Sequence, residues 1–325
     1  MKKYRPLPDD RSSIGYKAKK LFKRNWSGWL LMLPGLLLFT FFVWAPLVQN
    51  IILSFSETNG FEAVGGFNNF ENYIRVFQDT MFVNALVNTF KYIMWSIVIG
   101  FIVPIVLGLL LSEVVHFKSV FRLGIYFPSI VSGMAVVIMW SYLLDPNPGA
   151  VLNQLLTAFG LPVSEFLSNQ ELTIPLIVVT MTWRGAGGTV LVYLSALQNI
   201  DNAQYEAARM DGAGMFSRIW HVTLPHIKQT IKMLFILQII SVFQVFYEPL
   251  VMTDGGPNGA SVSLLLLSYK YAFRDFDGGA SAAVGVLLAA IIIVLTVLYL
   301  WMLRPKKDKM RNMLKWRKYA KKAEE

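Results

Sequence analysis

Apolar runs long enough to cross a lipid bilayer recur along the whole chain, and they leave little room for a water-soluble fold. A transmembrane helix needs about 20 mostly apolar residues to cross the hydrocarbon core. Of the 325 residues, 55% are apolar and only 15% are charged, which excludes an ordinary soluble domain. We predict an all-α polytopic membrane protein with six spans, near residues 28–49, 86–112, 121–144, 174–198, 230–252 and 282–303.

The basic residues lie in alternate loops, and this asymmetry predicts the orientation of the spans. Lys and Arg gather in two tails and recur in the 200–229 loop, whereas the 145–172 loop contains none. Cytoplasmic loops are the ones enriched in Lys and Arg, so both termini and the 200–229 loop are predicted to be cytoplasmic. The net charge of +10 is then explained by attraction of the tails to an anionic leaflet rather than by nucleic acid.

The chain therefore divides into three predicted segments. Residues 1–27 form a basic cytoplasmic tail, residues 28–303 form the transmembrane domain, and residues 304–325 form a second basic cytoplasmic tail. The first apolar run is too long for a signal peptide and lacks a small-residue cleavage site, so it is interpreted as the first span.

Several kinds of chemistry are excluded by the residues present. The sequence has no Cys, which rules out disulfides, thiolate metal sites and a Cys nucleophile. It also lacks the G-x-x-x-x-G-K-[ST] phosphate loop. His116, His221 and His226 are scattered and predict no metal site, and no nucleophile and base pattern for an enzyme is visible.

Residues 205–225 form a polar segment between two apolar spans, and its pattern predicts two short helices. Tyr205–Asp211 can make the first helix, and the glycines at 212 and 214 end it. A second apolar stripe follows, and Pro225 restarts the chain toward the membrane. Two short helices at an angle would make a rigid knob suited to a groove on another protein. The stripe consists of Phe216, Ile219, Trp220 and Leu224.

This segment resembles the Glu-Ala-Ala loop of ABC importer permeases, a resemblance carried by Glu206, Ala207, Ala208, Asp211, Gly212, Ala213, Leu224 and Pro225. Other stretches resemble the maltose-type, carbohydrate-uptake branch of binding-protein-dependent permeases, in matching order and spacing. They are Trp29 to Pro34, Ser54-Phe55, Phe67 to Tyr73, Thr182-Trp183-Arg184-Gly185, Leu197 to Ile200, Val251 to Pro257, Tyr271 to Phe273 and Gly279 to Ala282.

The resemblance implies the type I ABC importer permease fold and a non-enzymatic transport subunit in a bacterial or archaeal cell membrane. Its implied partners are a second homologous permease, two copies of a cytoplasmic ABC ATPase and an extracytoplasmic sugar-binding protein. The chain itself would carry no cofactor, because ATP and Mg would be bound by the ATPase. The Glu-Ala-Ala residues would dock the ATPase.

Arg184 falls near the middle of the fourth span, where a charge is costly and must face protein or water. It is predicted to face the substrate path, with pairing to a carboxylate such as Glu248 as the alternative. On the fifth span, a three-and-four spacing places five side chains on one helical stripe. These are Gln238, Ser241, Val242, Val245 and Glu248.

The resemblance further implies that Arg184, Gly185, Gly188, Gln238, Val242 and Val245 occupy sugar-contacting positions. Polar side chains would be needed at these positions to bind the hydroxyl groups of a sugar, but two of them hold valine. The part of the substrate cavity formed by this chain is therefore expected to be mostly apolar. A neutral oligosaccharide is the main prediction. Because an Arg fork binds carboxylate and phosphate well, an acidic sugar or glycerol phosphate is an alternative. An ion-coupled secondary transporter is the alternative from another class, but it leaves the docking loop unexplained.

Two loops carry apolar stretches too short to span the membrane, which are typical of interfacial or re-entrant segments. One is residues 262–273. In the other, one helical face is formed by Leu152, Leu155, Leu156 and Phe159.

Overall fold

A computed structural model describes residues 26–113 and 117–303, most of which are helical. The basic tails up to residue 25 and from residue 304, together with His116, lie outside the described residues. Within the described part, five continuous helical stretches are long and apolar enough to cross a membrane. They are Trp26–Ser54, Thr80–Glu113, Thr173–Gln198, Met215–Phe243 and Gly278–Met302. The prediction of a polytopic helical membrane protein is confirmed, with corrections at two spans and one hairpin.

Two of the stretches, α10 (Thr173–Gln198) and α16 (Gly278–Leu303), are unbroken helices. The other three contain a short π-helical turn, a feature that is frequent at functional sites. The first stretch is α2 (Trp26–Phe39), η2 (Thr40–Trp44) and α3 (Ala45–Ser54). The second is α5 (Thr80–Trp95), η3 (Ser96–Phe101) and α6 (Ile102–Glu113). The last is α12 (Met215–Arg218), η5 (Ile219–Thr223) and α13 (Leu224–Phe243).

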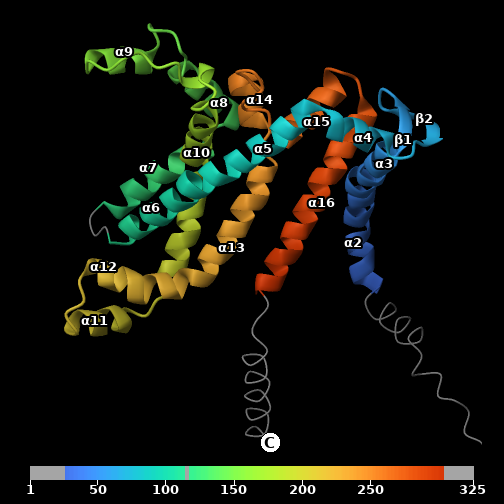
Figure 1. Ribbon diagram of the computed structural model, residues 1–325. Coiled ribbons are helices and arrows are strands. Elements are labelled where there is room, and N and C mark those ends of the chain that lie inside the picture. Colours follow the sequence, from blue (N-terminus) through green and yellow to red (C-terminus); the bar gives the residue numbers. More distant parts are fainter. Residues whose placement is uncertain (1–25, 114–116, 304–325) are drawn as a thin grey trace, which may run out of the picture.

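The helices form a bundle with two distinct ends (Figure 1). One, called here the α11 end, carries α11 (Asn202–Met210) and α12. The other, the α9 end, carries α9 (Val151–Ala158), α14 (Tyr247–Thr253) and α15 (Leu264–Phe273). The buried core lies between α5, α10, α13 and α16. By contrast, α2 has no buried residue and presents apolar side chains all round, as a lipid- or partner-facing helix does.

The third predicted span, 121–144, is not one straight helix. It consists of α7 (Lys118–Ile130) and α8 (Gly133–Leu143), whose axes are bent by 95°. Val131 and Ser132 between them have extended backbone, which ends one helix and starts the next. The bend brings Gly133 against α10, where a Cβ on this residue would lie 3.0 Å from an Arg184 Nη1 atom.

The fifth predicted span, 230–252, is also broken, because α13 ends before α14 begins. Pro249 accounts for the break. It has no N–H to donate to the Val245 carbonyl four residues earlier, and its ring would clash with that carbonyl in a continuous helix. The Ser263 hydroxyl donates to the Val245 carbonyl instead, at 2.5 Å.

A small antiparallel sheet follows the first span and was missed by the all-α prediction. It pairs β1 (Ser56–Asn59) with β2 (Glu62–Phe67). Asn59 pairs with Glu62, which leaves Gly60 and Phe61 as a two-residue turn, and Gly60 has the positive φ of 61° that such turns require. The Asn-Gly dipeptide was the sequence signal for this hairpin.

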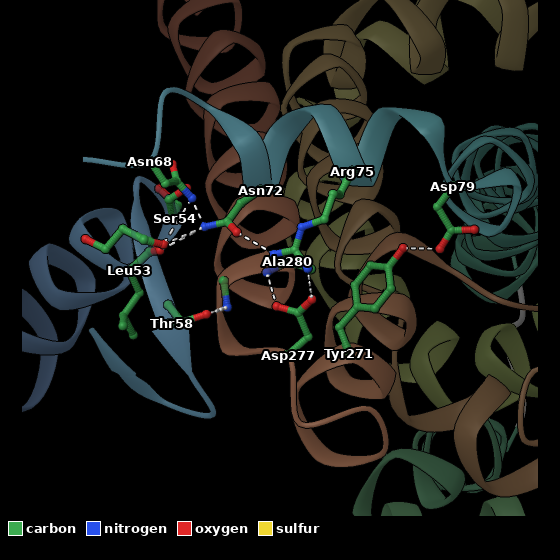
Figure 2. Close-up of polar contacts among 12 residues, drawn as sticks. Leu53, Ser54, Thr58, Asn68, Asn72, Arg75, Asp79, Tyr271, Asp277 and Ala280 are labelled. Atoms are coloured by element: carbon green, nitrogen blue, oxygen red, sulfur yellow. Dashed lines mark hydrogen bonds and ion pairs between the residues drawn. The ribbon is translucent and has the colours of Figure 1, made fainter. Parts of the chain in front are cut away.

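Asn72, on α4 (Glu71–Gln78), caps the end of the first span from the side. Its side chain is buried, and its amide lies within hydrogen-bonding distance of three carbonyls, those of Leu53, Ser54 and Ser56, at 3.3, 3.2 and 3.0 Å (Figure 2). Carbonyls at a helix C-terminus have no partner within the helix. Asn68 adds a further bond to the Ser56 carbonyl at 3.1 Å. Asn68 and Asn72 therefore explain why this part of the chain, from Phe67 to Tyr73, carries asparagines: they supply hydrogen-bond donors to the end of the first span.

Asp79 joins α5 to α15 at the same end of the bundle. One carboxylate oxygen caps α5 by accepting from the Met81 N–H at 2.8 Å, and the other accepts from the Tyr271 hydroxyl (Figure 2). Burial and this hydrogen bond raise the pKa of Tyr271 above its ordinary value. The phenol therefore stays protonated and continues to donate throughout the physiological range.

Asp277 joins α4 to α16 in the same manner. It caps α16 by accepting from the Ala280 N–H at 2.9 Å, and it pairs with Arg75 at 2.8 Å (Figure 2). Arg75 also donates to the Asn72 side-chain oxygen at 2.6 Å. A Cβ at Gly279 would lie only 2.7 Å from the Asn72 amide, so this close approach needs glycine. The polar network thus fastens the first span, α4 and α16 together.

Replacing Asn72 by alanine is expected to destabilise the protein by about 1–3 kcal/mol, because buried carbonyls lose their donor. The measurement is the shift in apparent Tm of the purified protein in detergent. Gln78→Ala is the matched control, because Gln78 is exposed on the same helix. Equal Tm values for the two variants would contradict the proposed role of Asn72.

Candidate functional site

The helix predicted over Tyr205–Asp211 is present as α11, and its two ends are fixed by local hydrogen bonds. The Asp201 carboxylate caps the start by accepting from the Ala203 N–H at 3.0 Å. At the other end Gly212 has a φ of 76°, and its N–H donates to the Arg209 carbonyl while the Ala213 N–H donates to the Ala208 carbonyl. This pattern is a Schellman motif, which uses glycine in the left-handed region to end a helix.

The second predicted short helix proves to be the beginning of a long one. Residues Met215–Phe243 are continuous through α12, η5 and α13, so Pro225 does not restart the chain. The π-helical turn Ile219–Thr223 ends one residue short of Pro225 in the sequence, with Leu224 between them. The missing N–H of Pro225 leaves a carbonyl of that turn without its α-helical donor. The knob is therefore one short helix, α11, folded back on the end of a span.

A small core fastens α11 to the spans that flank it. Leu197, Ile200 and Ile227 are buried in one cluster, and Tyr205 packs against them. The Tyr205 hydroxyl also hydrogen-bonds to the Thr223 hydroxyl at 3.0 Å, which joins α11 to the beginning of α13. These contacts therefore join α11 to both α10 and the long helical stretch that contains α13.

The predicted docking residues lie on the surface of this knob. Glu206, Ala207, Asp211, Gly212 and Pro225 are exposed, and Ala208, Ala213 and Leu224 are half-buried.

Three large apolar side chains project from the same region: Met210 is 88% exposed, Phe216 85% and Trp220 69%. Clustered exposed apolar side chains mark an interaction surface. Sequence reasoning placed Phe216 and Trp220 on the stripe but missed Met210. Met210 could have been identified from the sequence, because it is an apolar residue at the end of an otherwise polar helix.

Arg184 lies at the centre of α10 and contacts Glu248 of α14. The Arg184 Nη2 atom is 3.4 Å from the Glu248 Oε1 atom, and the Glu248 side chain is buried whereas that of Arg184 is 41% exposed. The sequence left open whether Arg184 pairs with Glu248 or faces a path, and the geometry shows a pairing that leaves the Arg184 side chain partly exposed. The Ser129 hydroxyl also donates to the Arg184 carbonyl at 2.7 Å and joins α7 to α10.

The glycines that follow Arg184 have different surroundings. A Cβ at Gly187 would lie 2.5 Å from the Ile125 carbonyl oxygen, so this glycine allows α7 to pack on α10. A Cβ at Gly185 or Gly188 would meet nothing within 4 Å. Gly185 and Gly188 therefore leave open surface on either side of the packing position.

The five side chains that were predicted to share one face of the fifth span do not form a continuous surface in the structure. Gln238 donates to the Ser96 hydroxyl at 2.6 Å, inside the π-helical turn η3, and Ser241 is exposed. Val242 and Val245 are 1% and 3% exposed, so the structure places both in the core, and their part in a substrate path stays a prediction. They pack in the core with Tyr92, because the break before α14 turns this part of the chain inward.

Of the predicted path residues, the structure thus brings together Arg184 and Glu248. In residues 26–113 and 117–303, no group of three His, Cys, Asp or Glu side chains is placed to hold a metal ion.

Comparison with known proteins gives one family and a consistent set of relatives. Residues 105–307 match the family described as binding-protein-dependent transport system inner membrane component. The chain is 34% identical over 276 residues to the polygalacturonan/rhamnogalacturonan transport system permease protein YteP of Bacillus subtilis, covering 83% of this chain and 85% of that protein. It is 32% identical over 277 residues to the arabinooligosaccharides transport system permease protein AraP of Halalkalibacterium halodurans, covering 84% and 86%.

Its fold resembles a chain in the crystal structure of a bacterial ABC transporter involved in the import of the acidic polysaccharide alginate. The TM-score is 0.78 at 26% identity, covering 88% of this chain and 98% of that chain. A second alginate transporter structure, in complex with an alginate pentasaccharide-bound periplasmic protein, gives 0.77 at 26% identity, covering 88% and 96%.

Removing one partner of the Arg184 and Glu248 pair is expected to destabilise the protein more than removing both. Arg184→Gln leaves a buried carboxylate without its cation, whereas Arg184→Gln with Glu248→Gln leaves two neutral amides. Because Arg184 is partly exposed, solvent screens the pair, and we expect a coupling free energy of about 1 kcal/mol. Apparent Tm values of the two single variants and the double variant measure it, and strictly additive losses would show that the pair is not coupled.

Proposed function

The chain belongs to the family of binding-protein-dependent transport system inner membrane components, and we propose that it is the permease subunit of an ATP-driven importer that translocates a sugar, an oligosaccharide, delivered by an extracytoplasmic binding protein. The observation that carries the ATP-driven part of this proposal is the knob. It combines a capped helix, an exposed apolar cluster and firm attachment to two spans, as a docking element for a motor protein requires.

The proposed partners follow from the family and from the relatives. They are a second homologous permease, two copies of a cytoplasmic ABC ATPase and an extracytoplasmic sugar-binding protein; the alginate transporter has been seen with its periplasmic protein. The knob would then face the cytoplasm in a bacterial or archaeal cell membrane. Glu206 and the exposed apolar side chains of the knob would contact the ATPase.

The chain is proposed to be a transport subunit and not an enzyme. ATP and Mg would be bound and ATP hydrolysed on the partner ATPase, with no cofactor on this chain. Movement of the ATPase would displace α11, and the Tyr205 and Thr223 contact would carry that displacement into α13. The spans would then rock between arrangements open to one side or the other. An ion-coupled secondary transporter does not dock an ATPase, so it would leave the knob unexplained.

Replacing Gly212 by valine is expected to uncouple ATP hydrolysis from transport. A Cβ-branched residue is strained at a φ of 76°, although a Cβ there would meet no atom within 4 Å. The helix end is therefore expected to move while the spans remain intact. The measurements are sugar uptake and ATPase activity in proteoliposomes of the complex purified through this chain.

The matched control is Gly212→Asn, because asparagine adopts the left-handed region readily. We expect it to retain coupled transport. Intact transport by Gly212→Val would refute the role of the knob. Purification of the unmodified chain without an ATPase and a second permease, with transport that needs no ATP, would refute the proposed function itself.

A second candidate substrate class, an acidic oligosaccharide, is favoured by the environment of Arg184. Its side chain is partly exposed, and Gly188, one turn further along the same face of α10, has no atom within 4 Å of the place a Cβ would take. A planar guanidinium binds carboxylate through two parallel hydrogen bonds. The likeness to an importer of an acidic polysaccharide agrees with this candidate, whereas the likeness to an arabinooligosaccharide permease agrees with a neutral sugar.

If the substrate is acidic, Arg184→Gln is expected to lower uptake of an acidic oligosaccharide about tenfold or more, since a hydrogen bond to a charged group contributes about 1.5–3 kcal/mol. Uptake of a neutral oligosaccharide of equal length is the control. Uptake of radiolabelled oligouronides and of neutral oligosaccharides by proteoliposomes decides between the classes. An equal loss for both would assign Arg184 to the packing of α10 against α14 instead.

A further inference from the structure

The segment between α8 and α10 forms an arm at the α9 end of the bundle. It contains α9 and the short helical turn η4 (Phe166–Ser168). In Figure 1, α9 lies across the direction of the long helices and extends beyond their outline. The arm is joined to the bundle where α9 packs on α8 and where Leu152 contacts the core.

Asn153 holds the arm in one conformation. Its side chain is fully buried, and its amide donates to the carbonyls of Pro146, Asn147 and Ser164 at 3.2, 3.2 and 3.1 Å. Its oxygen accepts from the Ser164 N–H at 2.9 Å. The two ends of the arm are thus tied to its central helix, so the surface of the arm is preorganised and needs no ordering on binding.

This rigid arm exposes an apolar face. Val151 and Leu155 lie one turn apart on α9, and Phe159 follows one turn later, at the end of the helix. Phe159 is 82% exposed, and exposed apolar side chains continue in the turn that follows it. The side chains of the face are those of Val151, Leu155, Phe159, Leu161 and Val163, each about half exposed or more. Gln154, by contrast, lies on the polar side of the helix.

The chemistry of the arm favours a lipid over a protein partner. From Pro146 to Ser164 the sequence contains no charged residue, although this stretch connects two spans at the membrane surface. The charged side chains of the arm, those of Asp145, Glu165 and Glu171, lie outside the stretch that carries the apolar face, so the face itself offers a protein partner no charge to fix its orientation. A helix with one apolar and one polar face that lies across the spans at their ends matches the boundary between headgroups and acyl chains.

We propose that α9 and the turn after it insert their apolar face into the interfacial layer of the leaflet at the α9 end, as a monotopic anchor. The anchor fixes the depth of α8, because α9 packs directly on that helix. The bend that begins α8 touches Arg184, so the anchor also holds this side of the Arg184 and Glu248 pair at a constant depth. The proposal does not depend on the substrate or on which side of the membrane is cytoplasmic.

The absence of Cys permits a direct test by single-site spin labelling. Phe159→Cys and Gln154→Cys are labelled with a nitroxide, and the chain is reconstituted in nanodiscs with whatever partner chains purify with it. Power saturation then compares accessibility to oxygen, which concentrates in the bilayer, with accessibility to a water-soluble nickel chelate. We expect oxygen to dominate at position 159 and the nickel chelate to dominate at position 154.

Two results would overturn the proposal. Dominance of the nickel chelate at both positions would show that the arm stands in water. Protection of position 159 from both reagents would show that a protein, such as a second permease, covers the face. Leu155→Cys provides an independent label on the same face and is expected to behave as position 159 does, so a poorly expressed Phe159 variant would not prevent a decision.

Discussion

Backbone groups inside a membrane must find hydrogen-bond partners within the protein, and this requirement organises the α9 end of the bundle. The loop after α14 shows the effect most clearly. Asn88 of α5 donates to the carbonyls of Gly259 and Val262 at 2.8 and 3.2 Å, and Tyr92 donates to the Ser261 carbonyl at 3.0 Å. Polar side chains of one span thus replace the water that an exposed loop would use. The polar residues of α5 are therefore explained by the backbone they serve.

The two ends of the bundle differ in a way that suits a transport cycle. The α9 end is held by hydrogen bonds and an ion pair that join the first span, α4 and α16, as at Asn72 and Asp277. At the α11 end the knob is attached through Tyr205 and a small core, while Met210 and its apolar neighbours remain uncovered. The proposed docking surface thus lies at the end of the bundle that these hydrogen bonds and this ion pair do not join, which is where movement of an ATPase would enter.

The approximate positions of five of the six spans could be predicted from the sequence, because an apolar run must be long enough to cross the bilayer, whereas the third proved to be the bent pair α7 and α8. The helix over Tyr205–Asp211 was predictable from local signals that act within a few residues. The breaks in the helices were harder to predict. The break before α14 depends on Pro249 and on Ser263, which is distant in the sequence from the Val245 carbonyl to which it donates. The burial of Val242 followed from that break and could not be read from helical periodicity. The hairpin at Gly60 was visible in the sequence but was overlooked beside the stronger apolar signal.

The break between α13 and α14 also decides how movement of the knob can reach the polar pair in the membrane. The beginning of α13 is fastened to α11, whereas α14 is held to α8, α10 and the loop that α5 supports. A displacement of α13 therefore need not carry Glu248 with it. Arg184 stands on α10, which is itself packed against the knob at its other end. The ion pair thus joins α10, which packs against the knob, to α14, which the break separates from α13.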